Sequence, residues 1–166
     1  LPSALARPPQ AGPSRAVPLA GSDELQPAHP LLRLLAALID SALVGVGESL
    51  LLSFVVAYWW NRNWSEIGYV PILLSVLLVC LALLLGALYF VFFWGVQGAT
   101  PGKKALGLQV VDLQGRVPIG VGSAILRLLG YVVAGLPLGL GFLLVPLTGR
   151  GLHDRIAGTL VVEREK

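Results

Sequence analysis

Two long runs of apolar residues dominate the chain, and a short polar connector separates them. The first run covers 31–60, and the second covers 69–97, of which 69–94 holds no charged residue. Because a helix rises about 1.5 Å per residue, a run of this length reaches roughly 45 Å, enough to cross the hydrocarbon core and both headgroup layers of a bilayer. The connector at 61–68 is short enough to force two helices to lie antiparallel and side by side. The pattern therefore predicts two transmembrane helices.

Aromatic residues gather at both ends of these runs. One group surrounds the connector, and the other closes the second run at 89–94. Aromatic side chains, Tyr and Trp above all, are enriched at the two membrane–water interfaces, where their rings lie at the depth of the headgroups. Aromatic groups at both ends therefore favour helices that cross the bilayer completely.

A polar excursion at 98–117 follows the second run. Thr100 is placed to cap a short helix that has Pro101 at its first position, and Gly107 ends that helix. The residues from Leu108 onward then predict a short strand. Residues 158–163 repeat the pattern of 107–112, since each segment opens at a glycine, continues with β-branched residues and closes at a carboxylate. We expect these two segments to pair as a small cytoplasmic β ribbon.

A third apolar stretch covers 120–147, but glycine and proline interrupt it at 135–141. Proline removes a backbone donor and glycine weakens a helix, so one straight helix is not expected. Two complete crossings would need roughly 40 residues, more than the stretch contains. It is therefore either a single broken span or a re-entrant helical hairpin that enters and leaves the bilayer on the same side.

The distribution of basic residues favours the re-entrant hairpin. The connector holds only Arg62, which Glu66 offsets, whereas basic residues recur in the tail, in the excursion and in the C-terminal segment at 150–163 and beyond. The positive-inside rule places those basic segments in the cytoplasm. The expected fold is an all-α membrane protein with two transmembrane helices, a third broken or re-entrant segment, a small cytoplasmic β ribbon, and both termini in the cytoplasm.

Residues 1–30 form a Pro- and Ala-rich tail ahead of a membrane domain at 31–166. The tail lacks a continuous apolar core followed by a cleavage site, so it is predicted to be a linker and not a signal peptide. Its composition is typical of disorder, and any order in it would require a partner protein. We expect other membrane protein subunits to contact this tail and the helix at 69–94, and lipids to surround the rest.

Composition excludes several classes of function. Charged residues make up only 13% of the chain, against roughly 25% in a soluble domain. The net charge of +3 comes without a stripe of Lys and Arg, so nucleic-acid binding is not expected. The single cysteine, Cys80, excludes both an intrachain disulfide and a cysteine metal site. No catalytic triad, carboxylate pair in a polar cleft or HExxH motif is found, so we expect no enzyme activity, cofactor or metal.

Three segments of the chain, in this order, resemble the RDD family of small bacterial membrane proteins. The first is Arg33-Leu-Leu-Ala-Ala-Leu-Ile-Asp40, which matches the arginine and first aspartate of the family. The second is the turn and strand Gly98-Ala-Thr-Pro-Gly-Lys-Lys-Ala-Leu-Gly-Leu-Gln-Val-Val111, and the third is Leu152-His-Asp-Arg-Ile-Ala-Gly-Thr159, which carries the second aspartate, Asp154. The resemblance implies the membrane fold over 31–163. The roles it implies are diverse, because some members are linked to cation/proton exchange and others are accessory parts of larger assemblies.

The charged residues of these segments are the candidate site. Arg33 and Asp40 lie seven residues apart, so a helix turns both to nearly the same face. A carboxylate below the interface costs about 2.5–3.5 kcal/mol on insertion scales unless it is paired, and the candidate partners of Asp40 are Arg127 and Arg155. Together with Asp154, these residues predict a charge cluster that locks the C-terminal segment to the helices. A proton or cation site at Asp40 is the alternative.

Glu48 lies deeper in the first run, and no basic residue can be assigned to it from the sequence. A carboxylate at that depth is protonated, lines water or contacts a partner. Glu48 therefore either joins Asp40 in a possible ion or proton site or accepts a hydrogen bond from a serine at position 41, 49 or 53.

The function expected from these features is that of a non-catalytic accessory or scaffold subunit of a larger bacterial membrane protein complex. The alternative is a cation/proton antiporter or other small transporter that uses Asp40 and Glu48, and it would have to be oligomeric because so few helices cannot enclose a pathway. Lys103 and Lys104 suit anionic lipid headgroups at the cytoplasmic face. A lipid-binding module is a third option, for which the sequence offers no discriminating residue.

Overall fold

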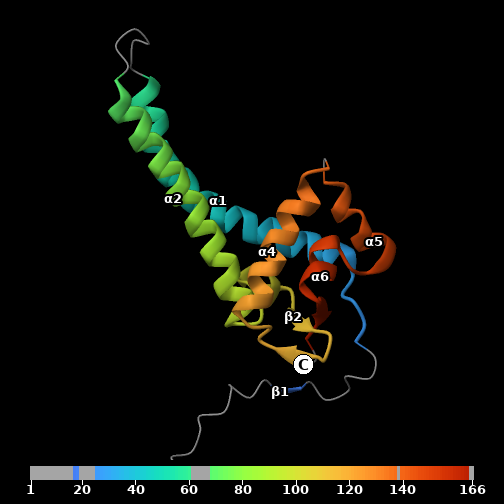
Figure 1. Ribbon diagram of the computed structural model, residues 1–166. Coiled ribbons are helices and arrows are strands. Elements are labelled where there is room, and N and C mark those ends of the chain that lie inside the picture. The colour runs from blue at the N-terminus through green and yellow to red at the C-terminus, as the bar shows by residue number, and fades with distance from the viewer. Residues whose placement is uncertain (1–16, 19–24, 61–67, 138, 165–166) are drawn as a thin grey trace, which may run out of the picture.

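A long helical hairpin forms one half of the molecule. The computed structural model describes residues 17–18, 25–60, 68–137 and 139–164. The hairpin consists of α1 (Pro30–Trp60) and α2 (Tyr69–Gly95), and its outer half extends away from every other element (Figure 1). Both helices are long and apolar enough to cross a membrane, and only 11% of the most apolar window of each is buried. Within the described residues, the two predicted spans are therefore confirmed as helices of transmembrane length.

Small residues on α2 let α1 approach it closely. Ala82 and Gly86 are the buried positions in the middle of α2. A Cβ added at Gly86 would lie 2.5 Å from Oε1 of Glu48 and 3.4 Å from Val44 on α1. Nearer the outer end, the Trp59 indole N–H donates a hydrogen bond to Ser75, with 2.8 Å between nitrogen and oxygen. Small-residue contacts and interhelical hydrogen bonds are the forces that hold helices together in a bilayer, where the hydrophobic effect between them is absent.

The other half of the molecule contains the predicted ribbon. After α2 come the short helix α3 (Pro101–Ala105) and the strands β2 (Leu108–Asp112) and β3 (Arg116–Val117). β2 pairs antiparallel with β4 (Thr159–Glu163), which places Val110 opposite Val161. The expected pairing of the two similar segments is thus observed. A second two-stranded pair joins β3 to β1 (Val17–Pro18).

The third apolar stretch is a broken helical hairpin. α4 (Val121–Gly135) ends near the proline, and the chain reverses through Gly139, whose φ of 80° favours glycine. The 3-10 helix η3 (Leu140–Phe142) and the helices α5 (Leu144–Thr148) and α6 (Leu152–Ala157) then lead back to β4. Because β4 lies beside β2, the chain returns through α6 to the end of the molecule at which α4 begins (Figure 1).

The elements from α3 to β4 form the half of the molecule that we call the body. Part of the predicted tail packs on this body. The backbone N–H of Ala28 donates a hydrogen bond to the carbonyl of Val161 at 2.8 Å, and the Ala28 side chain is buried. Leu25 packs against a small apolar cluster of the ribbon that contains Val111, Leu160 and Val162. The packed domain therefore begins several residues before the predicted boundary at 31. The expected disorder and partner contacts of the tail fall mostly on residues 1–16 and 19–24, and those, like the connector at 61–67, lie outside the described residues.

Candidate functional site

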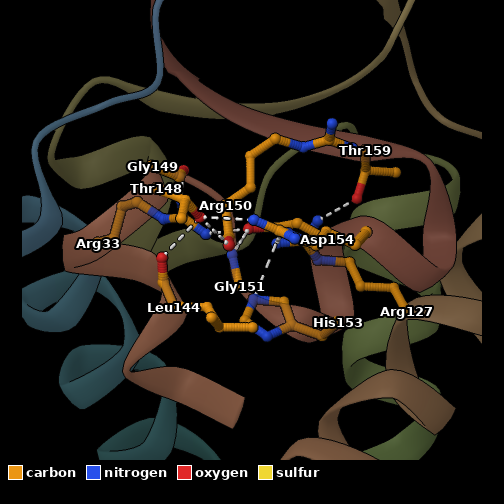
Figure 2. Close-up of polar contacts among 11 residues, drawn as sticks. Arg33, Arg127, Leu144, Thr148, Gly149, Arg150, Gly151, His153, Asp154 and Thr159 are labelled. Carbon is orange, nitrogen blue, oxygen red and sulfur yellow. Dashed lines mark hydrogen bonds and ion pairs between the residues drawn. The ribbon is translucent and has the colours of Figure 1, made fainter.

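A buried aspartate at the start of α6 holds two arginines from other helices. Close packing places it there, since a Cβ at Gly130 on α4 would lie 2.7 Å from the Cα of His153. Asp154 is 0% exposed and forms ion pairs with Arg33 of α1 and Arg127 of α4 (Figure 2). It also accepts a hydrogen bond from the backbone N–H of Gly151 at 3.0 Å. One carboxylate thus ties α1 and α4 to α6.

Arg127 is fully enclosed, like Asp154, with 0% of its surface exposed. Its Nη1 donates a hydrogen bond to the hydroxyl of Thr159, and its guanidinium lies 5.2 Å from the ring centre of Trp94. Its Nη2 is 2.6 Å from Oδ1 of Asp154, but neither atom has a hydrogen bond of acceptable geometry. The contact is therefore held by charge more than by a directed N–H···O bond, and the cation–π contact adds to it.

The second buried aspartate, Asp40 of α1, has four polar partners. The hydroxyls of Tyr89 and Thr100 donate hydrogen bonds to its carboxylate, as does the backbone N–H of Gly102 at 2.8 Å. The ammonium of Lys103 lies 3.7 Å from Oδ2. Three of these partners come from the segment that includes α3, so Asp40 anchors that short helix against α1 and α2. Glycine is required at position 102, because a Cβ there would lie 2.5 Å from the carbonyl oxygen of Ala36 and 2.8 Å from Oδ1 of Asp40.

The two aspartate centres form one electrostatic network. Burial and then the charge of Arg127 lower the pKa of Lys103 to about 8, against the opposing attraction of Asp40. Burial acts to raise the pKa of Asp154, but Arg127 and Arg33 outweigh it and hold that pKa at about 2. Counted by formal charge, the network contains three cations, Arg33, Lys103 and Arg127, and two carboxylates, Asp40 and Asp154, which leaves one excess positive charge.

His153 is the neutral member of this network. Burial, followed by the charge of Arg127, lowers its pKa to about 3. Its ring stacks on Tyr131 with 4.0 Å between ring centres, and neither ring nitrogen has a hydrogen-bond partner within the described residues. A neutral imidazole avoids adding a second excess charge beside the arginines, so His153 packs as an aromatic ring.

Comparison of the sequence with known proteins shows the family to which the chain belongs. The model of the RDD family matches residues 27–158, a range that contains Arg33, Asp40 and Asp154. The chain belongs to the RDD family. It is 30% identical over 149 residues to the uncharacterized protein YxaI of Bacillus subtilis, covering 82% of this chain and 97% of the relative. It is 34% identical over 92 residues to the uncharacterized protein RP437 of Rickettsia prowazekii, covering 55% of this chain and 52% of the relative, so the chain spans about half the length of that protein. No solved structure matches.

This RDD protein departs from the sequence expectations at three charged residues. Arg155 is exposed, donates to the hydroxyl of Thr148 at 3.0 Å, and takes no part in the predicted cluster. Arg127 pairs with Asp154, and Lys103 replaces it as the cation nearest to Asp40. The prediction that Lys103 contacts lipid headgroups is wrong, because its side chain is buried at 4% exposure. Lys104 is exposed, and its contact with lipid headgroups stays a prediction.

Sequence reasoning missed two of the hydroxyl ligands and assigned a third differently. The sequence indicates Tyr89 as an interfacial aromatic residue, and Thr159 as a strand residue at the end of the third family segment, with no polar role for either side chain. Thr100 does precede α3 as its cap residue, but its side chain forms no capping hydrogen bond and donates to Asp40 instead. A hydroxyl donates a stronger hydrogen bond to a charged carboxylate than to a neutral acceptor, and this bond orients the Thr100 side chain toward Asp40. The proximity of these groups to an aspartate depends on the tertiary fold and carries no local signal.

Glu48 is the carboxylate of the RDD hairpin that the network does not include. It is half-buried and lines a groove of about 460 Å³ between α1 and α2, together with Phe54 and Gly86. No ion pair or side-chain hydrogen bond joins it to any residue in the described part of the chain. None of the three expected serines forms a hydrogen bond with Glu48 in the described residues. Ser49 and Ser53 instead donate to backbone carbonyls of their own helix. The predicted pairing of Asp40 with Glu48 in one site is therefore not supported by the polar contacts of either residue.

Over the described ranges, no set of three or more His, Cys, Asp or Glu side chains is arranged to hold a metal ion.

Proposed function

We propose that this RDD protein is a non-catalytic accessory subunit that docks its α1–α2 hairpin against other proteins within a membrane. The proposal rests mainly on the contrast between its carboxylates. Asp40 and Asp154 are occupied by internal partners, whereas Glu48 faces a groove at the level of the bilayer with no partner among the described residues.

The occupied aspartates support a structural role for the family signature. Together they connect α1 to α3, α4 and α6, so the charged residues fix the arrangement of the body around the base of the hairpin. A carboxylate that carries ions or protons must release its partners during each cycle. Asp40 would have to give up three hydrogen bonds and an ion pair, which makes it a poor carrier.

The face around Glu48 has the properties of a helix–helix interface. An exposed carboxylate facing lipid costs about 2.5–3.5 kcal/mol or more, whereas a donor or cation on a partner helix removes that cost. The hydroxyls of Ser49 and Ser53 are exposed on the same helix, and a second groove beside them runs to Trp60. Small and hydroxyl side chains allow close approach and hydrogen bonding between helices in a bilayer. Ser49 and Ser53 lie about 100° and 140° around α1 from Glu48, so α1 carries features that favour a protein neighbour over lipid on more than one side.

The proposed topology places the body and the ribbon in the cytoplasm and treats α4 to α5 as a re-entrant hairpin in the inner membrane of a bacterium. Exposed basic residues on the body, such as Arg116 and Arg155, support a cytoplasmic location by the positive-inside rule. Single cysteines introduced as Gln114→Cys and Arg155→Cys, in a Cys80→Ala background, test it. Both should be labelled from the cytoplasmic side of inverted vesicles, and labelling from opposite sides would exclude the re-entrant path.

Photo-cross-linking in the native membrane tests the docking itself. A photoreactive residue at Phe54, which is exposed and lines the groove with Glu48, should give one discrete heteromeric product, and one at Leu83, which is exposed on α2 outside the groove, should give a weaker or diffuse product. Glu48→Gln should reduce the Phe54 product and the amount of complex purified in mild detergent. Glu163→Gln, which removes an exposed carboxylate from the ribbon, is the matched control. A chain that purifies alone and cross-links only to lipid would contradict the proposal.

A cation/proton antiporter is the rival function, and the observation in its favour is the carboxylate of Glu48, which has no polar partner among the residues that the structure describes. The purified chain in liposomes should show no cation-dependent proton flux if it is an accessory subunit. Flux that Glu48→Gln abolishes and Asp40→Asn leaves intact would establish the rival and place its site in the groove.

A further inference from the structure

A second, polar cavity lies where α2 leaves the proposed membrane region. It measures about 240 Å³ and is lined by the turn that follows α2, by α3, by residues of β2 and β3, and by Arg164, which follows β4. Its side chains with polar heads are Gln97, Lys104, Gln109 and Arg164. The cavity is separate from the aspartate network, because Lys103 turns inward from α3 while Lys104 stays exposed. The two neighbouring lysines therefore belong to two different sites: Lys103 to the aspartate network and Lys104 to the polar cavity.

Backbone hydrogen bonds fix the rim of this cavity. The N–H of Arg164 donates to the carbonyl of Gly107 at 2.6 Å, and the N–H of Val110 donates to the carbonyl of Gly98 at 2.8 Å. The first contact holds the residue after β4 beside the start of β2, and the second holds the middle of β2 against the turn after α2. The backbone of Lys104 is joined to the same place, because its carbonyl accepts a hydrogen bond from the N–H of Gly107 at 3.2 Å. The backbone positions of Lys104 and Arg164 are therefore fixed, even though both side chains are exposed.

The chemistry of the lining suits a phosphate group. Lys104 and Arg164 each bring a positive charge, and no carboxylate from the described residues lines the cavity. The ammonium of Lys104 donates to Oε1 of Gln97 at 3.0 Å and lies 5.9 Å from the ring centre of Phe93. The oxygen of the Gln97 amide is thereby occupied, which leaves its NH₂ group to donate to a ligand. Two cations and amide donors around one hollow are the groups that bind phosphate oxygens.

The position of the cavity points to a lipid as the source of that phosphate. It begins one residue after Val96, which is half exposed like Phe92 on the last turn of α2. Aromatic and apolar side chains at a helix end mark the depth of the headgroups, with acyl chains on one side and water on the other. A ligand bound here would place its phosphate among the cations and its chains along Phe92 and Val96.

We infer that this cavity is a binding site for the phosphate headgroup of an anionic phospholipid, with Lys104 and Arg164 as its charged ligands. The inference needs α2 to cross the bilayer but does not depend on a partner subunit. Each cation near a membrane surface contributes about 1 kcal/mol to the binding of anionic lipid, so loss of one should weaken binding about fivefold.

Titration of the purified full chain in a non-ionic detergent tests the site by calorimetry. The probes are short-chain phosphatidylglycerol, short-chain phosphatidylcholine and inorganic phosphate. Phosphatidylglycerol should bind saturably and more tightly than phosphatidylcholine. Lys104→Gln and Arg164→Gln should each weaken its binding about fivefold, and the double variant about 25-fold. Arg155→Gln removes an equal charge from an exposed position outside the cavity and should leave the binding unchanged.

The outcomes separate the site from its alternatives. Equal weakening by Lys104→Gln and Arg155→Gln would mean general surface attraction and would overturn the site. Inorganic phosphate that binds as tightly as phosphatidylglycerol, with the same dependence on Lys104, would overturn the lipid source. Since the titration uses the isolated chain, its failure leaves the docking of the hairpin untouched, and failure of the cross-linking experiment leaves this site untouched.

Discussion

The excess positive charge of the buried network makes a specific prediction about Lys103. Its ammonium is surrounded by Asp40, Asp154, Arg33 and Arg127, and burial is the main reason why its pKa falls to about 8 from 10.5. In the unfolded chain the ordinary pKa of 10.5 returns. Between pH 8 and 10.5 the unfolded state therefore binds more protons than the folded state, so stability rises with pH across this window.

The size of the effect follows from the two pKa values. A pKa of about 8 against 10.5 corresponds to about 3 kcal/mol in the free energy of unfolding. Lys103→Met keeps a side chain of similar length but removes the titration. Asp40 then retains the donors Tyr89, Thr100 and Gly102, so its carboxylate stays hydrogen-bonded. We expect the stability of the variant relative to wild type to fall by about 3 kcal/mol between pH 7 and pH 10.5, because the wild type alone gains stability there.

Equilibrium unfolding in detergent, followed by circular dichroism at steps of pH, measures this difference. Comparing the two proteins at each pH removes the titration of tyrosines and other groups that they share. Parallel pH profiles of wild type and Lys103→Met would refute the reasoning, since they would show that Lys103 is not held in an unfavourable charged state.

Three further changes test the packing and charge of the body, each read from the free energy of unfolding in detergent. Gly102→Ala should destabilise by about 2–4 kcal/mol, because its Cβ would clash with a carbonyl oxygen and displace an N–H from Asp40, whereas Gly122→Ala in open space should be neutral or slightly stabilising. Asp154→Asn should cost about 3–5 kcal/mol by leaving buried arginines unpaired, and Asp112→Asn, in a more exposed pair, at most about 1 kcal/mol. Acid should also remove the contribution of Asp154, whose lowered pKa stabilises the fold above pH 4 and is lost progressively toward pH 2, so Asp154→Asn should flatten the acid limb of the profile. Equal costs for the two asparagine variants would contradict the burial argument.

The elements of this protein follow directly from local patterns in its sequence. A helix satisfies its backbone groups internally, so long apolar runs predict α1 and α2 wherever the rest of the chain goes. The matching segments that end at Asp112 and Glu163 predict the ribbon, because β-branched residues and flanking glycines act locally. The break in the third stretch follows in the same way from its proline and glycines. The three family segments also identify Arg33, Asp40 and Asp154 as a set.

Only the tertiary structure decides which charges meet. Lys103 and Lys104 are identical neighbours in the sequence, yet one is buried beside Asp40 and the other lines a polar cavity, because the side of α3 that packs on α1 is chosen by the close approach at Gly102. Arg127 reaches Asp154 for a similar reason, since Gly130 brings α6 onto α4. Ion pairing depends on distances of a few ångströms between segments far apart in the chain, and sequence spacing determines such distances only within a single helix.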